Sequence, residues 1–404
     1  MTRLYLGAIL AISALLRFWR LDQPGDLVFD EIYYVDGARD YLSVGVEIDG
    51  RDGEFVVHPP FGKWLIAVGI RLFGDNSFGW RFSSALAGTI AIALIFLIAK
   101  KLFASDYLAL IAALLSTLDG LHLVMSRVAL LDMFLTTLLL AGVLSFLYQK
   151  HLLSALFFGL ALSTKWNALF LIATLLIYLL VKERRSILYY LFVIPVTYLS
   201  SWIGWFQSDL GYDRFASANP LLSLFNYHRK ILDFHNSLDA AHPYEASPWT
   251  WLFLGRPTSF FYESPKCGAG ECSREILAMG TPLIWWLGVI ALLFTLKHLF
   301  LKKDWIAGFI VLTFAASYLP WLLFPERTTF YFYAITLQPF LILSICYSVH
   351  VFLKTPIGER YGEIAVQSAI SLVTLIFIYF LPIFVGTTLS YEAWSARMWF
   401  ESWI

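Results

Sequence analysis

The chain has 404 residues, of which 59% are hydrophobic and 14% are charged, and its mean hydropathy is +0.69. These values lie far from the averages of soluble domains and indicate a polytopic membrane protein. Lys plus Arg equals Asp plus Glu at 29 each, so the net charge gives no reason to expect a nucleic-acid partner.

Apolar segments suited to a bilayer recur along the whole chain. A window of about 20 residues predicts membrane helices near residues 4–19, 80–99, 105–123, 129–148, 152–164, 167–181, 187–206, 280–299, 305–323, 329–352 and 364–388. That makes about eleven helices, of which 152–164 is short for the hydrocarbon thickness. The first segment lacks a small-residue cleavage site, so we interpret it as a retained anchor rather than a removed signal peptide.

The connections between these segments predict the orientation of the chain. Basic residues gather in alternate short connections, at Lys100, Lys101, Lys150, Lys182, Arg184, Arg185, Lys302, Lys303, Lys354 and Arg360. Because such residues favour the cytoplasmic side, we expect a cytoplasmic N-terminus in a plasma membrane. The two long loops, 20–79 and 207–279, and the C-terminal tail would then lie outside the cell.

The predicted architecture is one all-α membrane domain over residues 1–404, with no separate soluble domain. The segment HPPFGKWLIAVGIRLFG in the first loop has helical periodicity but is too polar and short to span, so we expect an interfacial helix. The second loop predicts another such helix around NYHRKILDFH, followed by an irregular Trp-rich segment after the prolines.

Two adjacent carboxylates, Asp30 and Glu31, follow the first apolar segment in the run LVFDEIYYVDGARDYL. A carboxylate in an outer loop is suited to act as a general base. Acidic residues are also favoured where helices begin, so the pair could simply cap a helix. The residues alone leave both interpretations open.

Further ionisable residues lie at the outer ends of predicted helices. Arg127 and Asp132 occur in MSRVALLDMF, and Lys165 occurs in STKWNALF. Charges at membrane depth are costly and usually face a cavity or a partner. Arg127 and Asp132 are five residues apart, which is a poor helical pair, so we expect each to have a partner elsewhere. The cations suit a lipid phosphate, although snorkelling to lipid headgroups is the alternative.

The histidines and cysteines do not predict a metal centre. His228, His235 and His242 are spaced by seven residues, too far apart along a helix to share one ion directly, so we expect hydrogen-bonding or capping roles. We predict no cofactor. A divalent cation is left open but is not predicted, because the sequence shows no compact carboxylate cluster to hold one. Cys267 and Cys272 lie close together in one polar loop. They could form a disulfide or stay as two free thiols, and the sequence leaves both states open.

Seven motifs in a fixed order carry a resemblance to a known family. They are FDEIYYVDGARDY, VHPPFGKWLIAVGIRLFG, FGWRFSSALAG, LDGLHLVMSRVALLDM, STKWNALF, HPYEASPWTWLFLGRP and PERTTFYFYAITLQPF. Together they run from about Asp30 to Gln338 and resemble the bacterial protein O-mannosyltransferases.

The resemblance implies a C-type glycosyltransferase fold and inverting transfer of mannose from a polyprenyl-phosphate-mannose donor to Ser/Thr hydroxyls of exported proteins. Asp30 would be the general base, and Glu31 would help to position the acceptor or the base. Arg127 would be structural or contact the phosphate, and Lys165 would be a phosphate ligand. The further candidates for substrate binding are His58, Lys63, His242, Tyr244, Arg256 and Arg327.

Two other functions fit parts of the sequence. A related transferase could move a lipid-linked sugar such as aminoarabinose to a glycolipid, although the DE pair and HPYEASPW favour a protein acceptor. A lipid transporter would be expected to show internal repeats or broken helices, and neither is visible. Eukaryotic members of the family carry a soluble domain in the second loop, for which this loop has no room.

Overall fold

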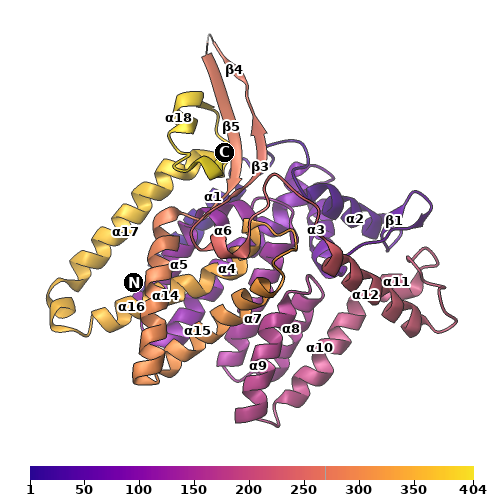
Figure 1. Ribbon diagram of the computed structural model, residues 1–404, viewed down its shortest axis with the longest axis horizontal. Helices are drawn as coiled ribbons and strands as arrows, with labels where there is room; N and C mark the ends of the chain where they lie inside the picture. Colours follow the sequence, from indigo (N-terminus) through magenta and orange to yellow (C-terminus); the bar gives the residue numbers. More distant parts are fainter. Residues whose placement is uncertain (269) are drawn as a thin grey trace.

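The computed structural model describes residues 1–268 and 270–404 as a bundle of helices with a β-hairpin projecting from one end (Figure 1). The helices are α1 (Thr2–Phe18), α2 (Glu31–Ser43), α3 (Phe61–Phe73), α4 (Ser77–Phe103), α5 (Asp106–Thr117), α6 (Gly120–Met125), α7 (Leu131–Leu147), α8 (His151–Leu162), α9 (Ala168–Lys182), α10 (Ile187–Ser201), α11 (Ile203–Gln207), α12 (Pro220–Ser237), α13 (Pro248–Trp251), α14 (Pro282–Lys302), α15 (Trp305–Tyr318), α16 (Gln338–Phe352), α17 (Pro356–Phe384) and α18 (Tyr391–Ser395). Short 3-10 helices are η1 (Leu319–Leu323), η2 (Tyr331–Thr336) and η3 (Glu401–Trp403).

Each apolar segment indicated by the sequence contains helix, but the segment near 105–123 is split between α5 and α6, and the segment near 329–352 is split between η2 and α16. Four helical stretches are long and apolar enough to cross a membrane: α4, α14, α15 with η1, and α17. Six shorter apolar helices accompany them, namely α5, α7, α8, α9, α10 and α16. A mostly helical membrane protein is therefore confirmed, while the count of eleven crossings stays a prediction.

Local sequence explains where the longest helices begin and end. The Asn76 side chain accepts a hydrogen bond from the Gly79 amide and caps α4, and Lys100 and Lys101 lie in its last turn, where cations favour the helix dipole. Proline occupies the first turn of α12, α14 and α17, where its missing amide is not needed.

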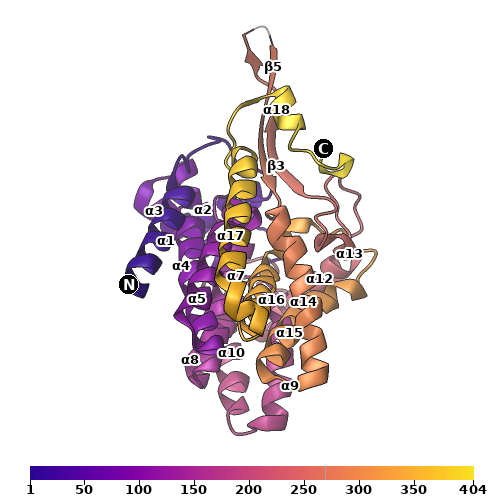
Figure 2. The ribbon, with the colours of Figure 1, turned by 90° about the vertical axis from the view of Figure 1, so that its left-hand side faces the viewer.

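The core lies where α4, α5, α7 and α8 pack side by side (Figure 2). Close approach depends on small residues, as in membrane helix pairs generally. A Cβ added to Gly142 of α7 would lie 2.5 Å from the ring of Phe158 on α8, a side chain that is fully buried. A larger residue at position 142 would therefore push these two helices apart.

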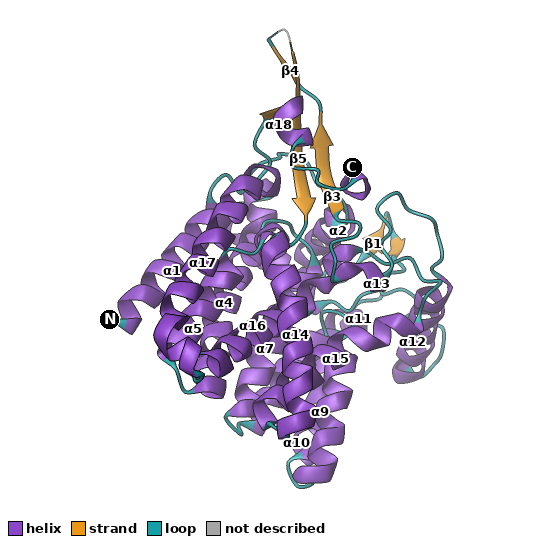
Figure 3. Cartoon of the chain, turned by 60° about the vertical axis from the view of Figure 1, so that its left-hand side comes forward, coloured by secondary structure: helices purple, strands orange, loops and turns teal. Residues whose placement is uncertain are grey.

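The second long loop contains strands as well as helix (Figure 3). β3 (Thr258–Glu263) pairs antiparallel with β5 (Gly270–Ala278), which also pairs with β4 (Lys266–Cys267) and β6 (Leu389–Ser390). β1 (Ile48–Asp49) and β2 (Asp52–Gly53) form a small hairpin in the first loop. The all-α description was therefore incomplete, because the β-branched and aromatic run TSFFYE was not recognised as a strand.

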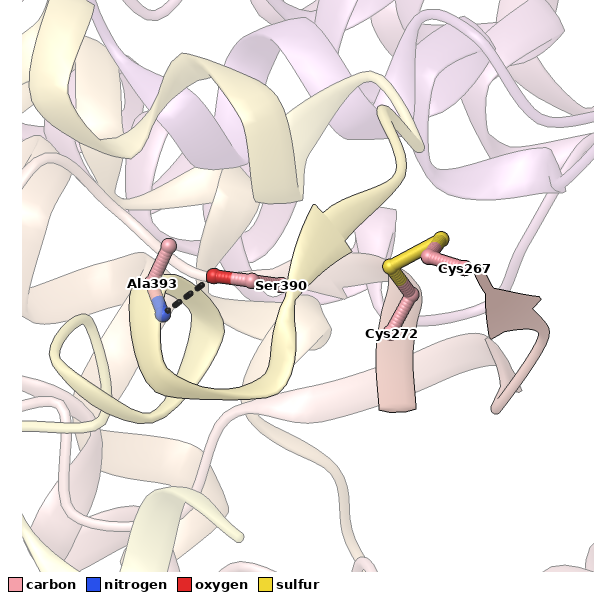
Figure 4. The surroundings of a disulfide bond; sticks show 4 residues. All are labelled: Cys267, Cys272, Ser390 and Ala393. Atoms are coloured by element: carbon pink, nitrogen blue, oxygen red, sulfur yellow. Dashed lines mark hydrogen bonds between the residues drawn. A yellow bond between two sulfur atoms is a disulfide. The ribbon is translucent and has the colours of Figure 1, made fainter. Parts of the chain in front are cut away.

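The tip of the β3–β5 hairpin is closed by a disulfide between Cys267 and Cys272, with a Cα–Cα distance of 5.8 Å (Figure 4). Of the two states that the sequence left open, the structure has the disulfide. The two interfacial segments expected in the loops are helical: they form α3 and α12.

Candidate active site

Asp30 lies at the N-terminal end of α2, at the position that caps the helix, and its side chain is partly buried. The preceding residue, Phe29, has a φ of 49°, in the left-handed region that a bulky side chain rarely adopts. Its ring is held by Phe260, Phe330 and Phe332, with ring centroids 5.2, 5.4 and 5.7 Å away. Such strain persists only where the surroundings enforce it, and here it fixes the backbone that presents Asp30.

Glu31 is fully buried and all its acceptor capacity is used within the protein. The guanidinium of Arg81 donates to both carboxylate oxygens at 2.8 Å, and the amides of Val28 and Ala129 donate at 2.9 and 2.7 Å. Arg81 also donates to the carbonyls of Leu21, Pro24 and Asp26. The pair therefore ties the loop before Asp30 to α4 and to the start of α7.

Lys165 lies in the connection between α8 and α9, and its ammonium donates to both oxygens of Asp132 at 2.9 Å. It also lies 4.3 Å from the ring centroid of Tyr333. An ammonium has three protons, so one donor remains beyond the two that Asp132 accepts. Lys165 can thus stay paired and still offer a hydrogen bond to a ligand.

A cavity of about 200 Å³ opens beside Lys165. Its lining combines four basic side chains, an amide pair and a mostly apolar wall: His58, Lys165, Trp166, Asn167, Leu169, Phe170, Leu232, His235, Asn236, Trp321, Phe324, Arg327 and Tyr333. Two of its polar atoms, Nδ1 of His58 and Oδ1 of Asn167, are buried without a hydrogen-bond partner among the described residues. Buried polar atoms are normally paired, so these two favour a polar ligand in the cavity.

Asp30 adjoins this cavity without lining it. The charges of Lys165 and Asp132 both act on Asp30, and Tyr34, one turn along α2, lies with its ring 6.0 Å from that of His58 in the cavity wall. Burial raises the pKa of Asp30 to about 6, against the opposing effect of the Lys165 charge. A carboxylate with this pKa is ionised at neutral pH and is more basic than an ordinary aspartate, as a general base requires.

The two cavity histidines are neutral at ordinary pH. Burial, together with the nearby positive charges, holds the pKa of His58 well below its usual range and lowers that of His235 to about 4. His235 accepts from the Nη2 of Arg327 through its Nδ1 at 3.2 Å, and its Nε2 lies 3.0 Å from the carbonyl of Val57. The cationic charge of the cavity therefore comes from Lys165 and Arg327.

Arg127 does not face this cavity. Its guanidinium donates to the carbonyls of Leu16, Arg17, Trp19 and Arg20 at the end of α1, at 2.8 to 3.2 Å. The sequence predicted that Arg127 and Asp132 have separate partners, and this is confirmed. Of the two roles implied for Arg127, the structure favours the structural one, because these carbonyls occupy its donors.

Lys63 is likewise buried, and it pairs with Glu47 and donates to the carbonyl of His58 at 3.1 Å. It therefore positions the His58 segment and does not reach the cavity. Arg256 donates to the carbonyls of Pro243, Ser402 and Ile404, so it joins the second loop to the C-terminal tail.

His242 and Tyr244 form a tight turn beside the loop that ends in Phe29 and Asp30. The Tyr244 amide donates to Nδ1 of His242 at 3.1 Å, and the guanidinium of Arg256 lies 5.4 Å from the Tyr244 ring centroid. The His242 ring meets those of Phe29 and Phe330 edge-on, at 5.8 and 5.0 Å. His242 thus packs against Phe29, the residue before Asp30, and neither His242 nor Tyr244 lines the cavity.

One acidic cluster escaped the sequence analysis. Carboxylate oxygens of Asp36, Asp40 and Glu54 come within 4.8 Å of one another on α2 and the first loop. Asp40 already accepts from the amide of Ile48 at 3.0 Å, and two of the three residues are only partly buried. Exposed acidic groups of this kind are common, so the cluster does not by itself define a metal site.

Several residues that build the site were not singled out from the sequence. Arg81 stood inside the quoted motif FGWRFSSALAG, and Tyr333 inside PERTTFYFYAITLQPF, but neither has a local signal that marks it. Tyr34 follows Asp30 by one helical turn, a spacing that places the two side chains on one face. That spacing could have identified it.

Comparison with known proteins identifies the family. Residues 7–206 match the family model described as dolichyl-phosphate-mannose-protein mannosyltransferase, and residues 221–403 match the C-terminal four TMM region of protein-O-mannosyltransferase. The chain belongs to the protein O-mannosyltransferase family. The two matches together cover nearly all of it, so the resemblance seen in the motifs is confirmed.

Relatives in this family resemble the chain over its full length. The polyprenol-phosphate-mannose--protein mannosyltransferase of Corynebacterium glutamicum is 33% identical over 99% of this chain and 93% of its own. The protein of the same name from Mycobacterium tuberculosis is 31% identical over 98% of this chain and 91% of its own. Human protein O-mannosyl-transferase 1 is 32% identical, but the match spans 37% of this chain and 22% of the human protein.

Solved structures agree on the fold. The Saccharomyces cerevisiae Pmt1-Pmt2 complex bound to the sugar donor has a TM-score of 0.83 at 16% identity, covering 100% of this chain and 92% of its own. ArnT from Cupriavidus metallidurans bound to undecaprenyl phosphate has a TM-score of 0.60 at 16% identity. The match covers 94% of this chain and 70% of the ArnT chain. The C-type glycosyltransferase fold implied by the motifs is thus confirmed.

Proposed function

We propose that this protein O-mannosyltransferase transfers mannose from a polyprenyl-phosphate-mannose donor to Ser or Thr hydroxyls of exported proteins. The observation that carries the proposal is the position of Asp30, a carboxylate with a raised pKa, beside a cavity that contains Lys165 and Arg327. A base next to a cationic cavity is what glycosyl transfer from a lipid phosphate needs. The names of the full-length bacterial relatives support the same donor.

Asp30 would act on the acceptor. Its carboxylate takes the proton of the Ser or Thr hydroxyl as the oxygen attacks the anomeric carbon of mannose. The bond from that carbon to the phosphate oxygen breaks, and the polyprenyl phosphate leaves with the electron pair. One displacement inverts the anomeric configuration, and the negative charge of Asp30 also stabilises an oxocarbenium-like transition state.

Lys165 and Arg327 would meet the charge of the departing phosphate. Lys165 and Arg327 both line the cavity, and so does His58, whose buried Nδ1 has no hydrogen-bond partner among the described residues. Because cations stabilise the leaving phosphate, no general acid is required. The apolar wall formed by Leu169, Phe170 and Phe324 suits the first part of a prenyl chain.

Glu31 would be a positioning residue in this scheme. Its carboxylate is fully paired with Arg81 and two backbone amides, which leaves no free acceptor for a substrate. The division of labour between the two acids is then Asp30 as base and Glu31 as the anchor of the loop that carries it.

We infer the membrane topology from the positions of the basic connections. In Figure 1 the turn between α9 and α10 and the start of α17 lie on the side opposite to the β3–β5 hairpin. These connections carry Lys182, Arg184, Lys354 and Arg360, which favours a cytoplasmic location for them and for the N-terminus. With the predicted spans, one crossing precedes Asp30 and seven precede the hairpin, so both would lie outside. Labelling of Lys182→Cys from the outer side of intact cells would contradict this orientation.

The direct test of the function uses purified protein in lipid vesicles. With radiolabelled polyprenyl-phosphate mannose and a peptide containing one threonine, we expect label in the peptide that is lost when the threonine is replaced by valine. Label in a glycolipid fraction, with none in the peptide, would support the glycolipid transferase instead. Label in neither acceptor would contradict both.

The rate of transfer should fall in acid with the titration of Asp30. Burial disfavours the charged form and raises the pKa to about 6, so at pH 5 about a tenth of the molecules would carry the ionised base. We expect kcat to be level above pH 7 and to fall about tenfold per pH unit below pH 6. Initial rates at saturating donor and acceptor would measure this profile.

Glu54 is the control for this profile, because burial raises its pKa to about 7, close to that of Asp30. Glu54→Gln should leave the acid limb in place if Asp30 is responsible for it. His235, with a pKa of about 4, titrates too low to produce the limb. A profile that stays level down to pH 5 would contradict Asp30 as the base.

Arg327→Gln should raise KM for the donor roughly ten- to a hundredfold, because a charge-assisted hydrogen bond to phosphate contributes about 1.5–3 kcal/mol. The KM for the acceptor peptide should change little. Arg229→Gln is the matched control, since Arg229 is exposed on α12 and outside the cavity lining. Equal effects of the two variants would indicate general attraction of the anionic donor rather than a phosphate ligand.

A further inference from the structure

The β3–β5 hairpin has one open edge. The opposite edge of β5 is covered by β6, through Cys272 with Ser390 and Ser273 with Leu389. Within the described residues, β3 pairs only with β5. An exposed edge presents unpaired amides and carbonyls that can pair with another extended chain.

The register shows which groups point outward from β3. The Cys272 amide donates to the Pro265 carbonyl at 3.0 Å, so this is a hydrogen-bonded position of the ladder. Hydrogen-bonded pairs alternate with non-hydrogen-bonded pairs along an antiparallel ladder. The next two hydrogen-bonded pairs are therefore Glu263 with Arg274 and Phe261 with Ile276. Tyr262, between them, therefore turns its amide and carbonyl to the open edge, and Ser264 does the same.

Neither outward group of Tyr262 has a partner among the described residues. Among the hydrogen bonds of the described residues, none joins the backbone amide or carbonyl of Tyr262 to another group. The strand is also held rigidly: the Tyr262 ring lies 5.4 Å from that of Trp394, whose Nε1 donates to Glu275 at 2.6 Å. A rigid edge loses little conformational entropy when it binds a chain.

This edge leads to the candidate base. The base of β3 packs into the aromatic cluster next to Asp30, since the rings of Phe260 and Phe29 are 5.2 Å apart. Tyr262 lies two positions beyond Phe260 along the strand, a distance of about 7 Å. A chain paired with β3 at Tyr262 would thus place a residue two or three positions further along near Asp30.

We infer that the outer edge of β3 binds the acceptor polypeptide as an added antiparallel or parallel strand and guides its hydroxyl to Asp30. The inference rests on the proposed function. Strand addition recognises the main chain, and it therefore accepts many sequences around one Ser or Thr. The acceptor is a polypeptide, so it carries the alternating amides and carbonyls that this edge can pair.

The test uses wild-type protein and a series of acceptor peptides. Each peptide carries one N-methyl group, at a different backbone amide. Because alternate residues of a strand face its neighbour, we expect KM for the peptide to rise about tenfold at every second position on one side of the threonine. Methylation at the intervening positions should change KM far less. A flat profile, or one with no two-residue period, would overturn the inference.

A protein variant tests the same edge from the other side. Tyr262→Pro removes the outward amide, a change that edge strands tolerate, and should reduce about tenfold the preference for a long peptide over N-acetylthreonine amide. Tyr262→Phe keeps the amide and should retain the preference. Unchanged preference in Tyr262→Pro would overturn the inference.

These outcomes differ from a failure of the proposed function. If no mannose reaches N-acetylthreonine amide or any peptide with wild-type protein, the mannosyl transfer itself is contradicted. If both acceptors are mannosylated and N-methylation has no periodic effect, only strand addition at β3 is contradicted.

Discussion

Asp30→Asn should lower the rate of mannosyl transfer at least about a hundredfold, with the protein still folded. The amide keeps the size and the cap position of Asp30 at the start of α2 but cannot take a proton from the acceptor hydroxyl. No hydrogen bond of the buried Glu31 network involves the Asp30 side chain, so the loop should keep its shape. Turnover of a threonine peptide at saturating donor would measure the loss.

Asp26→Asn is the matched control for this variant. Asp26 is exposed in the same loop, and it is the Asp26 backbone carbonyl, not its carboxylate, that Arg81 contacts. The Asp26→Asn variant should retain at least half of the wild-type rate of mannosyl transfer. Near-normal turnover of Asp30→Asn would remove Asp30 as the base, whereas a similar loss in both variants would indicate that the negative charge of the loop matters and not a proton transfer.

The sequence predicted the helical architecture because its physical cause is local. A run of about 20 apolar residues favours helix in a bilayer whatever its partners are, and every such run contains helix in the structure, although those near 105–123 and 329–352 are interrupted. The isolation of Arg127 from Asp132 also followed from local geometry, because five residues do not bring two side chains onto one helix face.

The pairings within the site could not be predicted in the same way. Lys165 and Asp132 are 33 residues apart, and Arg81 and Glu31 are 50 apart. Only the packing of helices brings such residues together, and the sequence carries no period that reports it. Arg127, Lys63 and Arg256 were substrate candidates for the same reason: a cation looks alike in the sequence whether it meets a phosphate or a carbonyl.

The β3–β5 hairpin shows a different limit. Its strands contain aromatic and β-branched residues in a chain where such residues are already abundant, so the composition gives little contrast. The two cysteines were the clearest signal, since a hairpin brings residues on either side of a short turn within disulfide distance. The five-residue separation of Cys267 and Cys272 fits such a turn.

Glu31→Ala should reduce the free energy of unfolding by about 3–5 kcal/mol, because it leaves the guanidinium of Arg81 buried without its counter-charge. The rate of transfer should fall as well, since the loop that carries Asp30 loses its anchor. Unfolding in mixed micelles, followed by tryptophan fluorescence, would give the stability. Lys100→Ala is the control: it breaks an exposed pair with Asp106 and should cost no more than about 1 kcal/mol.

The double variant Glu31→Leu with Arg81→Leu separates the structural role of Glu31 from direct contact with substrate. Replacing both partners removes the unpaired charge, so it should recover part of the stability that Glu31→Ala loses. Recovery should be incomplete, because the carbonyls of Leu21, Pro24 and Asp26 also lose the donors of Arg81. If Glu31 instead bound the acceptor, Glu31→Gln would raise KM for the peptide and leave the free energy of unfolding unchanged. The full pairing of its carboxylate within the protein argues for the loss of stability.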